Sequence, residues 1–211
     1  MNYKQLLNIK YYIFTQSIVG SCYYLVKKLT PSHPIELPLT YIDIWIKPHY
    51  IAVWVYMSFF FLLIAGFIFS SKEDCIKCIK VILTNSVIAS LFFIFLPTKI
   101  TFNDYLPYIQ DNTITSNFIK LIKEYDNTYN CFPSLHISNS IVSTYFLSKH
   151  KNKYIQIFSV CWLLAIVWSV MSTKQHTIYD VVGGIVLAFI SLTIILYRPK
   201  IKDKIVSVSS I

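Results

Sequence analysis

The sequence has few glycines and few charged residues. Only 4 of its 211 residues are glycine and 14% are charged, whereas 55% are hydrophobic and 17% are aromatic. This composition excludes collagen-like and disordered chains and fits a soluble globular domain poorly. The excess of hydrophobic residues predicts an integral membrane protein instead, and the length allows one domain over residues 1–211.

Cysteines are also few and scattered, so no disulfide framework is predicted; they are Cys22, Cys75, Cys78, Cys131 and Cys161. Cys75 and Cys78 form a C-x-x-C pattern, but no second Cys or His pair lies nearby to complete the four ligands of a structural zinc. We therefore expect no metal and no cofactor. The sequence shows no long basic face and no nucleic-acid-binding module, so we expect no nucleic-acid partner.

Long apolar runs predict an all-α fold, a six-helix transmembrane bundle. A helix rises about 1.5 Å per residue, so about 20 residues cross a hydrocarbon core of about 30 Å. The expected spans cover residues 11–26, 50–70, 79–96, 132–148, 155–171 and 178–197. The fourth span is unusually polar, and polar groups at membrane depth face the bundle interior or a wet cavity.

An even number of spans puts both termini on one side of the membrane. The loops on that side carry twelve basic and three acidic residues, whereas the loops on the other side carry seven of each. By the positive-inside rule, both termini are expected to be cytoplasmic. We expect a bacterial inner membrane or another cell membrane as the location.

The two long loops, residues 27–49 and 97–131, both fall on the extracytoplasmic side, and long loops often carry function. Within the second, apolar residues recur at helical spacing over residues 113–125 and predict an amphipathic helix at the membrane interface.

Two histidines are expected to meet at that same face. His136 stands at the start of the fourth span and His176 just before the sixth, 40 positions later. This interval holds one helix across the membrane and one back. Asp180 follows His176 by four residues, so we expect the two side chains to share a helical face and the carboxylate to accept a hydrogen bond from the imidazole.

Further groups near these histidines suit an anion. Ser134 lies at a helix N-terminus, where free backbone N–H groups favour negative charge, and Lys174 adds a cation beside His176. A phosphate group is the natural ligand for this set. A metal site built on both histidines is the alternative, although Asp180 is the only further ligand within expected reach.

The segment Phe132-Pro133-Ser134-Leu135-His136 and the run Ser169 to Gly184 resemble the second and third signature motifs of the type 2 phosphatidic acid phosphatase superfamily. The third motif resembles most closely the branch of inositol phosphorylceramide synthase-like phosphotransferases. The resemblance implies a six-helix membrane fold in which His176 attacks phosphorus to form a phosphohistidine. It also implies that Asp180 orients His176, that His136 protonates the leaving oxygen and that Ser134 helps to bind phosphate.

Two positions depart from the family pattern. Val170 occupies the arginine position of the third motif, with Lys174 as the nearest substitute. The first motif is not legible: Phe102 stands where an arginine is expected, and Lys99 is the only base nearby. A lysine lacks the planar fork with which arginine grips phosphate. Lys99 and Lys174 are therefore the predicted phosphate-binding cations.

The function expected from the sequence is a lipid phosphatase or phosphotransferase. It would act on a lipid phosphate ester or anhydride at the extracytoplasmic surface without a metal, with membrane lipids as its surroundings. The alternative is a non-enzymatic protein, either a transporter or a decayed relative, whose polar fourth helix lines a cavity. The residues do not decide between water and a hydroxyl as the acceptor, and they do not indicate an oligomeric state.

Overall fold

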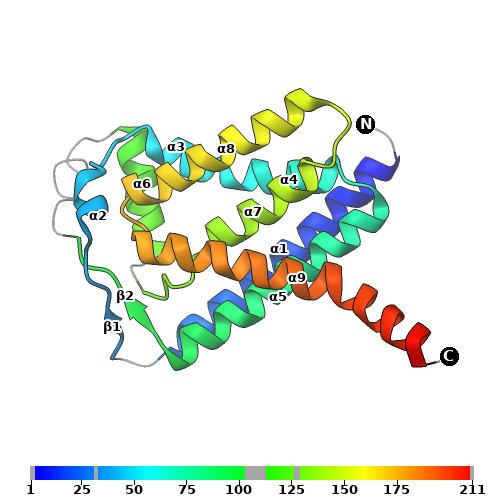
Figure 1. The fold of residues 1–211 in the computed structure, drawn as a ribbon. Helices are drawn as coiled ribbons and strands as arrows, with labels where there is room; N and C mark the ends of the chain where they lie inside the picture. Colours follow the sequence, from blue (N-terminus) through cyan, green and yellow to red (C-terminus); the bar gives the residue numbers. More distant parts are fainter. Residues whose placement is uncertain (1–2, 31–32, 103–112, 126–128, 210–211) are drawn as a thin grey trace.

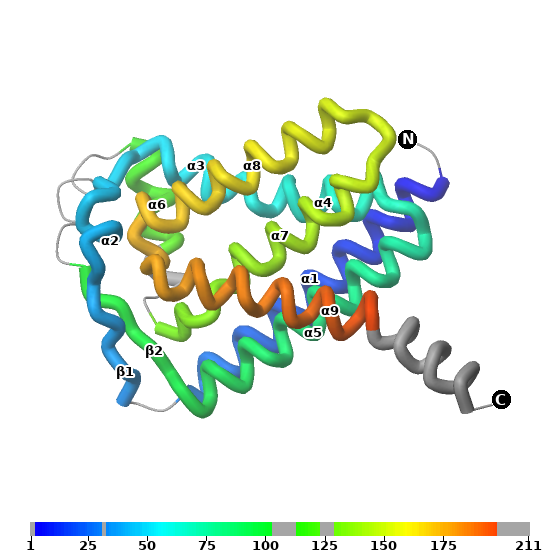
Figure 2. The backbone as a smooth tube through the Cα atoms, viewed as in Figure 1, coloured from blue at the N-terminus to red at the C-terminus, as the bar shows by residue number. Residues whose placement is uncertain are grey.

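The structure is a computed structural model that describes residues 3–30, 33–102, 113–125 and 129–209. The described residues are mostly helical, with one short parallel pair of strands (Figures 1 and 2). The elements in chain order are α1 Tyr3–Leu29, β1 Ile35–Glu36, α2 Tyr41–Trp45, α3 Ala52–Met57, α4 Phe59–Ile68, α5 Lys72–Phe95, β2 Thr98–Lys99, α6 Ile114–Tyr125, α7 Leu135–Leu147, α8 Lys153–Ser172 and α9 Ile178–Ser209.

All six segments predicted as spans are largely helical, but the second is divided. The others correspond to α1, α5, α7, α8 and α9, whereas residues 50–70 form α3 and α4 with a break at Ser58. The Ser58 hydroxyl donates a hydrogen bond of 2.6 Å to the Val55 carbonyl and accepts one of 2.8 Å from the Trp162 indole. A side chain that bonds its own helix backbone in this way commonly bends the helix.

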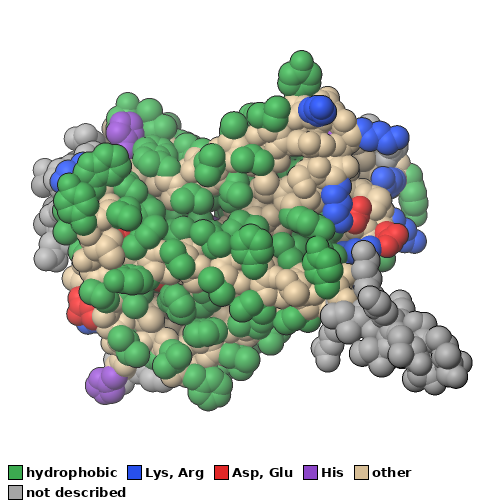
Figure 3. All heavy atoms as spheres, in the orientation of Figure 1, with side chains coloured by type: hydrophobic (Ala, Val, Ile, Leu, Met, Phe, Trp, Pro, Cys, Tyr) green, Lys and Arg blue, Asp and Glu red, His purple; other side chains and the backbone are tan. Residues whose placement is uncertain are grey.

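Three helices in the described part of the chain are long and apolar enough to cross a membrane: Lys72–Phe95, Lys153–Ser172 and Ile178–Tyr197. Their outward faces carry large exposed apolar side chains, such as Phe158 on α8 and Phe189 on α9. Figure 3 shows hydrophobic side chains spread over the visible face. Such a surface suits a bilayer, because soluble proteins rarely expose apolar patches of this extent.

Helix α7 lies inside the bundle and contacts α4, α5, α8 and α9. The sequence-based expectation for the polar fourth span is confirmed, because its serines, threonine and asparagine are buried: Ser138, Asn139, Ser140, Ser143 and Thr144. At 13 residues this helix is about 20 Å long, shorter than a hydrocarbon core of about 30 Å. Neighbouring helices therefore shield its polar groups.

The two ends of the bundle differ in character. Helices α2 and α6 and the two strands gather at one end, and the start of α1 lies at the other (Figure 1). At that second end the Lys149 ammonium lies 3.0 Å from the Asp74 carboxylate, which ties the α7–α8 turn to the start of α5. Figure 3 shows several Lys side chains, in blue, gathered there. The amphipathic helix predicted at residues 113–125 is present as α6, with Ile119 and Ile122 buried.

Helices α7 and α9 approach each other closely at two glycines. A Cβ atom built on Gly184 would lie 2.6 Å from the carbonyl oxygen of Ser134, and one on Gly183 would lie 2.4 Å from the Phe132 ring. Neither separation is compatible with a real side chain. Glycine at these positions therefore lets the segment before α7 rest directly on α9.

Candidate active site

His136 and His176 meet at the end of the bundle that holds α2 and α6. His136 lies in the first turn of α7, and His176 lies two residues before α9 begins. The Nε2 atom of His176 is 3.5 Å from the Nδ1 atom of His136. The convergence expected from their spacing is therefore found: α7 leads away from this end and α8 returns to it (Figure 1).

The two imidazoles have different surroundings. The His136 ring is half-buried against two aromatic rings, with centroid separations of 4.7 Å to both Tyr56 and Phe59. His176 is 7% exposed. Aromatic packing holds the His136 ring in the orientation in which its Nδ1 atom faces His176 Nε2.

Asp180 lies beside His176, but not in the way predicted. Helix α9 begins at Ile178, so His176 stands outside the helix and the expected shared helical face is wrong. The Asp180 carboxylate accepts hydrogen bonds from the backbone N–H of Thr177, at 2.8 Å, and from its hydroxyl, at 3.2 Å. Its distance to His176 Nδ1 is 3.5 Å, longer than an ordinary hydrogen bond.

The long separation has a clear cause. The Oδ2 atom nearest His176 is already the acceptor for Thr177, so Asp180 serves first as the N-terminal cap partner of α9. Asp180 Oδ1 and His176 Nδ1 are both buried without a hydrogen-bond partner. The carboxylate and the imidazole therefore lie next to each other, almost fully buried, without a hydrogen bond between them.

Ser134 is the N-cap of α7. Its hydroxyl accepts a hydrogen bond of 3.3 Å from the backbone N–H of Ile137, and its own N–H donates one of 3.1 Å to the carbonyl of Asp180. The side chain is fully buried. Ser134 thus joins the two helices that carry the histidines, and the predicted role in binding phosphate stays a prediction.

Lys174 bonds backbone carbonyls of the first long loop, and its predicted role in binding phosphate stays a prediction. Its ammonium donates hydrogen bonds to the backbone carbonyls of Asp43 and, at 2.6 Å, of Ile46. The same ammonium lies 4.9 Å from the centre of the Phe102 ring, so the residue at the expected arginine position of the first motif contacts Lys174 through its aromatic face. Lys174 therefore anchors the His176 loop to the C-terminal end of α2.

Asp43 is a further residue of the site region that the sequence analysis did not select. Its Oδ1 atom accepts a hydrogen bond of 2.8 Å from the backbone N–H of Ile178, and its Oδ2 atom accepts one of 2.6 Å from the Thr40 hydroxyl. With Thr40 it forms the capping box of α2. The pattern Thr-x-x-Asp was the available signal, because it marks a helix start.

Lys99 lies in β2, and its ammonium is 3.6 Å from the Glu36 carboxylate in the paired strand β1. A hydrogen bond from Thr101, together with the charge of Lys99, holds the pKa of the Glu36 carboxyl below its usual value. Both side chains are substantially exposed. This pair belongs to the surface of the loop region.

Both histidines open onto one cavity of about 540 Å³, a size typical of small-molecule sites. Its walls come from α1, α3, α4, α5, α6 and the start of α7, and they are mainly aromatic and aliphatic. Among the described residues that line it, Lys27 is the one with a cationic side chain. Ser134, Lys99, Lys174 and Asp180 are not among the lining residues.

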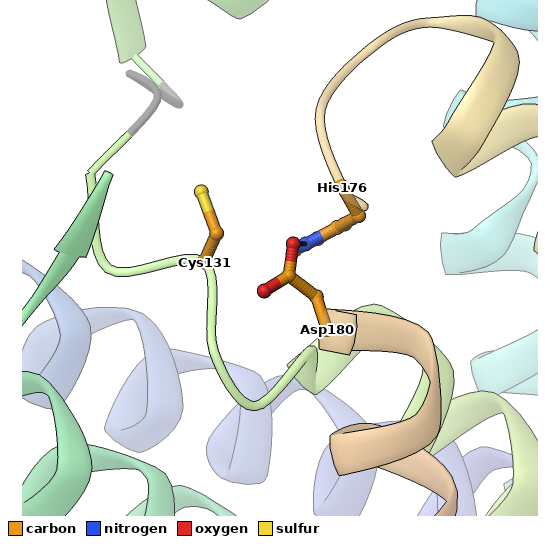
Figure 4. Close-up of side chains that lie close together, drawn as sticks. All are labelled: Cys131, His176 and Asp180. Atoms are coloured by element: carbon orange, nitrogen blue, oxygen red, sulfur yellow. Dashed lines mark ion pairs between the residues drawn. The ribbon is translucent and has the colours of Figure 1, made fainter. Parts of the chain in front are cut away.

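Three potential metal ligands lie together at the same place. A ligand atom each of Cys131, His176 and Asp180 lies within 4.8 Å of the other two, and all three residues are buried. Figure 4 shows their side chains gathered between the segment before α7 and the start of α9. Zinc accepts this donor set. A metal ion bound here would take one ligand atom from each of these three residues.

A family comparison agrees with the motifs. The chain matches the model of the family described as the PAP2 superfamily over residues 40–194, which includes both histidines and Asp180. Comparison with curated proteins and with solved structures found no match. The family match covers most of the chain and all of the candidate site. The chain therefore belongs to the PAP2 superfamily, the type 2 phosphatidic acid phosphatases that its motifs resemble.

Proposed function

We propose that this protein is a membrane lipid phosphatase or phosphotransferase that works through a phosphohistidine. PAP2 membership supports phosphatase or phosphotransferase activity in general. The observation that carries the proposal is the 3.5 Å approach of His176 Nε2 to His136 Nδ1 at the wall of a largely apolar cavity. Two facing imidazoles supply a nucleophile and a proton donor, and the cavity supplies space for a lipid.

In the first half-reaction His176 attacks through Nε2, because its Nδ1 atom faces Asp180. A nitrogen–phosphorus bond forms, the ester phosphorus–oxygen bond breaks, and His136 gives its proton to the leaving oxygen. In the second, His136 takes a proton from water or from an acceptor hydroxyl, whose oxygen displaces His176 from phosphorus. Because the two nitrogens are 3.5 Å apart, the rings must separate when a phosphoryl group enters between them.

Asp180 stabilises the positive charge that develops on His176 during attack. It is a positioning residue in this scheme, since it is fully buried and lies behind the imidazole as seen from the cavity. Three further residues support the histidines without lining the cavity: Asp43, Lys174 and Ser134. They fix α2, the His176 loop and the start of α7 relative to one another through the hydrogen bonds described above.

We place the site at the extracytoplasmic face of a six-span bundle with both termini in the cytoplasm. The basic loops support this orientation, because they lie at the end of the bundle away from the histidines. The sequence Thr173-Lys174-Gln175-His176 supports the inositol phosphorylceramide synthase-like branch, and hence transfer to a hydroxyl acceptor in addition to hydrolysis.

One observation favours the non-enzymatic alternative. Neither Lys99 nor Lys174, the lysines proposed to replace the missing arginines, lines the cavity that the histidines share. A dianionic phosphate held by two imidazoles alone would be poorly neutralised. A transporter or a decayed relative would need no such neutralisation.

A labelling experiment distinguishes the enzyme from the non-enzymatic alternative. Purified protein in nanodiscs is incubated with lipids that carry ³²P in the phosphate. We expect release of labelled phosphate, transfer of label when a lipid alcohol is added, and an acid-labile label on the wild-type protein. The His176→Ala variant should take up no label. Absence of both turnover and labelling in the wild-type protein, across a panel of phosphate monoesters and diesters, would rule out the enzyme.

A further inference from the structure

Cys131 is a buried thiol that the proposed mechanism does not use. It is 4% exposed and stands in the segment before α7, 45 positions ahead of His176. In the structure its side chain lies beside those of His176 and Asp180 (Figure 4). A ligand atom of each residue lies within 4.8 Å of the other two. Because the three residues come from two distant segments, no local ligand spacing in the sequence marks them as a group.

Two of these groups each have an atom available to a cation. Within the described part of the chain, the buried atoms His176 Nδ1 and Asp180 Oδ1 have no hydrogen-bond partner. The other atoms are engaged: His176 Nε2 faces His136 at 3.5 Å, and Asp180 Oδ2 accepts the N–H of Thr177. An unpaired buried polar atom is costly, and one bound cation satisfies both.

The three groups are close enough to share one ion. Zinc binds sulfur at about 2.3 Å and nitrogen or oxygen at about 2.0–2.2 Å, so tetrahedral ligands of one zinc lie about 3.3–3.6 Å apart. From the upper limit of 4.8 Å, side-chain movements of about 1 Å bring the atoms to that spacing. Cys131 and His176 also line the cavity of about 540 Å³, which gives an ion its route to the site.

Neighbouring hydrogen bonds hold the ligands in place. Thr98 of β2 accepts the N–H of Asn130 through its carbonyl, at 2.8 Å, and the N–H of Phe132 through its hydroxyl, at 3.2 Å. The residues on both sides of Cys131 are thereby fixed. The second oxygen of Asp180 is held by the start of α9. Bonds of this kind orient the ligands of a metal site.

The charges of the group suit a divalent cation that accepts sulfur. When zinc binds, the Cys131 thiol loses its proton to water, and the thiolate and the Asp180 carboxylate balance the two positive charges. The imidazole is a neutral ligand, so the buried complex carries no net charge and avoids the cost of an unpaired buried ion. Magnesium and calcium prefer oxygen ligands, so a thiolate and an imidazole favour zinc.

We propose that Cys131, His176 and Asp180 form a zinc site that inhibits the reaction at His176. The binding site stands by itself, whereas the inhibition rests on the function proposed above. Zinc on Nδ1 engages the carboxylate that stabilises positive charge on the His176 ring during attack. It also tethers this ring, which must move away from His136 when a phosphoryl group enters. The metal-free protein is then the active form.

Binding is tested with cobalt(II), which takes zinc sites and gives a thiolate-to-metal charge-transfer band when sulfur is a ligand. Metal-free wild-type, Cys131→Ser and Cys161→Ser proteins in nanodiscs are titrated with cobalt, which zinc then displaces. Cys161 is the matched control, because it is exposed on α8. We expect the band in the wild type and in Cys161→Ser, and its loss in Cys131→Ser, with zinc bound at least about tenfold more weakly.

Two results of this titration would overturn the site. One is the absence of the band in the wild-type protein. The other is an equal band in all three proteins, which would show adventitious binding at other cysteines only.

Inhibition is tested by the release of phosphate from dodecyl phosphate at rising zinc concentrations. Each protein is compared with its own metal-free rate. We expect zinc to stop turnover of the wild type and of Cys161→Ser at the concentrations that displace cobalt, and Cys131→Ser to need at least about tenfold more zinc. Equal zinc sensitivity of the wild type and Cys131→Ser would overturn inhibition through this site.

The two measurements separate this proposal from the proposed function. A cobalt band that depends on Cys131, in a protein without turnover, would support the metal site and count against the enzyme. Turnover in a protein that gives no cobalt band would support the enzyme and overturn the metal site.

Discussion

The carboxylate of Asp43 accepts a hydrogen bond of 2.8 Å from the backbone N–H of Ile178, 135 residues later in the chain. This N–H belongs to the first turn of α9, where helical N–H groups have no partner within the helix. Asp43 is 2% exposed, so water does not replace it. A residue of the first long loop thereby completes the start of the helix that follows His176.

Replacing Asp43 by Ala should lower both stability and activity. The Ile178 N–H would be left buried without an acceptor, at a cost of about 1–3 kcal/mol. We expect a lower midpoint of thermal unfolding in detergent and a fall in kcat/KM, because the His176 loop loses one anchor. Asn at position 43 keeps an acceptor oxygen and should retain most of both. Equal losses in the Ala and Asn variants would show that the hydrogen bond is not the important interaction.

Replacing either of the two histidines proposed as catalytic by Ala should abolish turnover without unfolding the protein. Loss of His136, the proposed general acid, should lower kcat by about 10²–10⁴-fold, and loss of His176, the proposed nucleophile, by at least as much. His150→Ala is the matched control, since this histidine lies in the α7–α8 turn at the far end of the bundle. Phosphate release from a lipid phosphate measures the effect. Near-normal rates in either variant would remove that histidine from the mechanism.

The sequence predicts the same phosphate-binding role for Lys174 and Lys99, but replacing each by Met should have very different effects on stability and activity. Lys174→Met leaves two carbonyls at the end of α2 without their donor and should lower both the unfolding temperature and kcat. Lys99→Met removes an exposed ion pair with Glu36, of a kind that typically contributes little, and should leave both nearly unchanged. A large rise in KM for Lys99→Met with unchanged stability would restore Lys99 as a phosphate ligand.

Activity should survive removal of divalent metals. In the proposed mechanism the two imidazoles carry out the nucleophilic attack and the proton transfers, and a metal on Cys131, His176 and Asp180 would occupy the nucleophile or its partner. EDTA should therefore leave the rate unchanged, and Cys131→Ser should retain activity. Loss of activity in EDTA that zinc restores in the wild-type protein, but not in Cys131→Ser, would establish a metal site instead.

The orientation in the membrane is open to labelling from outside the cell. Tyr41 is 80% exposed and lies in α2 at the histidine end, whereas Lys151 is exposed in the turn at the opposite end. A cysteine at position 41 should react with an impermeant maleimide in intact cells, and one at position 151 only after lysis. The wild-type protein gives the background from its own cysteines, of which Cys75 and Cys78 are fully buried. The reverse pattern would put the site in the cytoplasm.

The helices and the meeting of the histidines were predictable because both follow from regular local features. Apolar runs mark helices, and the 40 residues between His136 and His176 hold one helix outward and one back. The break at Ser58 was not predicted; the Ser58 hydroxyl bonds the Val55 carbonyl of its own helix and also accepts a hydrogen bond from the indole of Trp162, 104 residues later. No local pattern encodes such a contact.

The same reason explains why the sequence did not predict the contacts that these lysines make. Lys174 and Lys99 are close to the motifs along the chain, and sequence distance was the only available guide. In the structure the Lys174 ammonium donates hydrogen bonds to the carbonyls of Asp43 and Ile46, which lie more than 120 residues earlier in the chain. Lys27 of α1 instead lines the cavity. Which lysine shares a space with the histidines is decided by how α1 packs, and periodicity does not contain that information.

Gly184 also limits how this protein can change over generations. The smallest side chain that mutation can add there already collides with the Ser134 carbonyl oxygen, and a backbone atom cannot turn aside as a flexible side chain can. Even the smallest substitution at this position is therefore disruptive, because alanine must push the segment that carries His136 away from α9, the helix that follows His176. Residues that line the cavity can be substituted gradually in descendants of this chain, whereas the close packing at Gly184 constrains the separation of the two histidines.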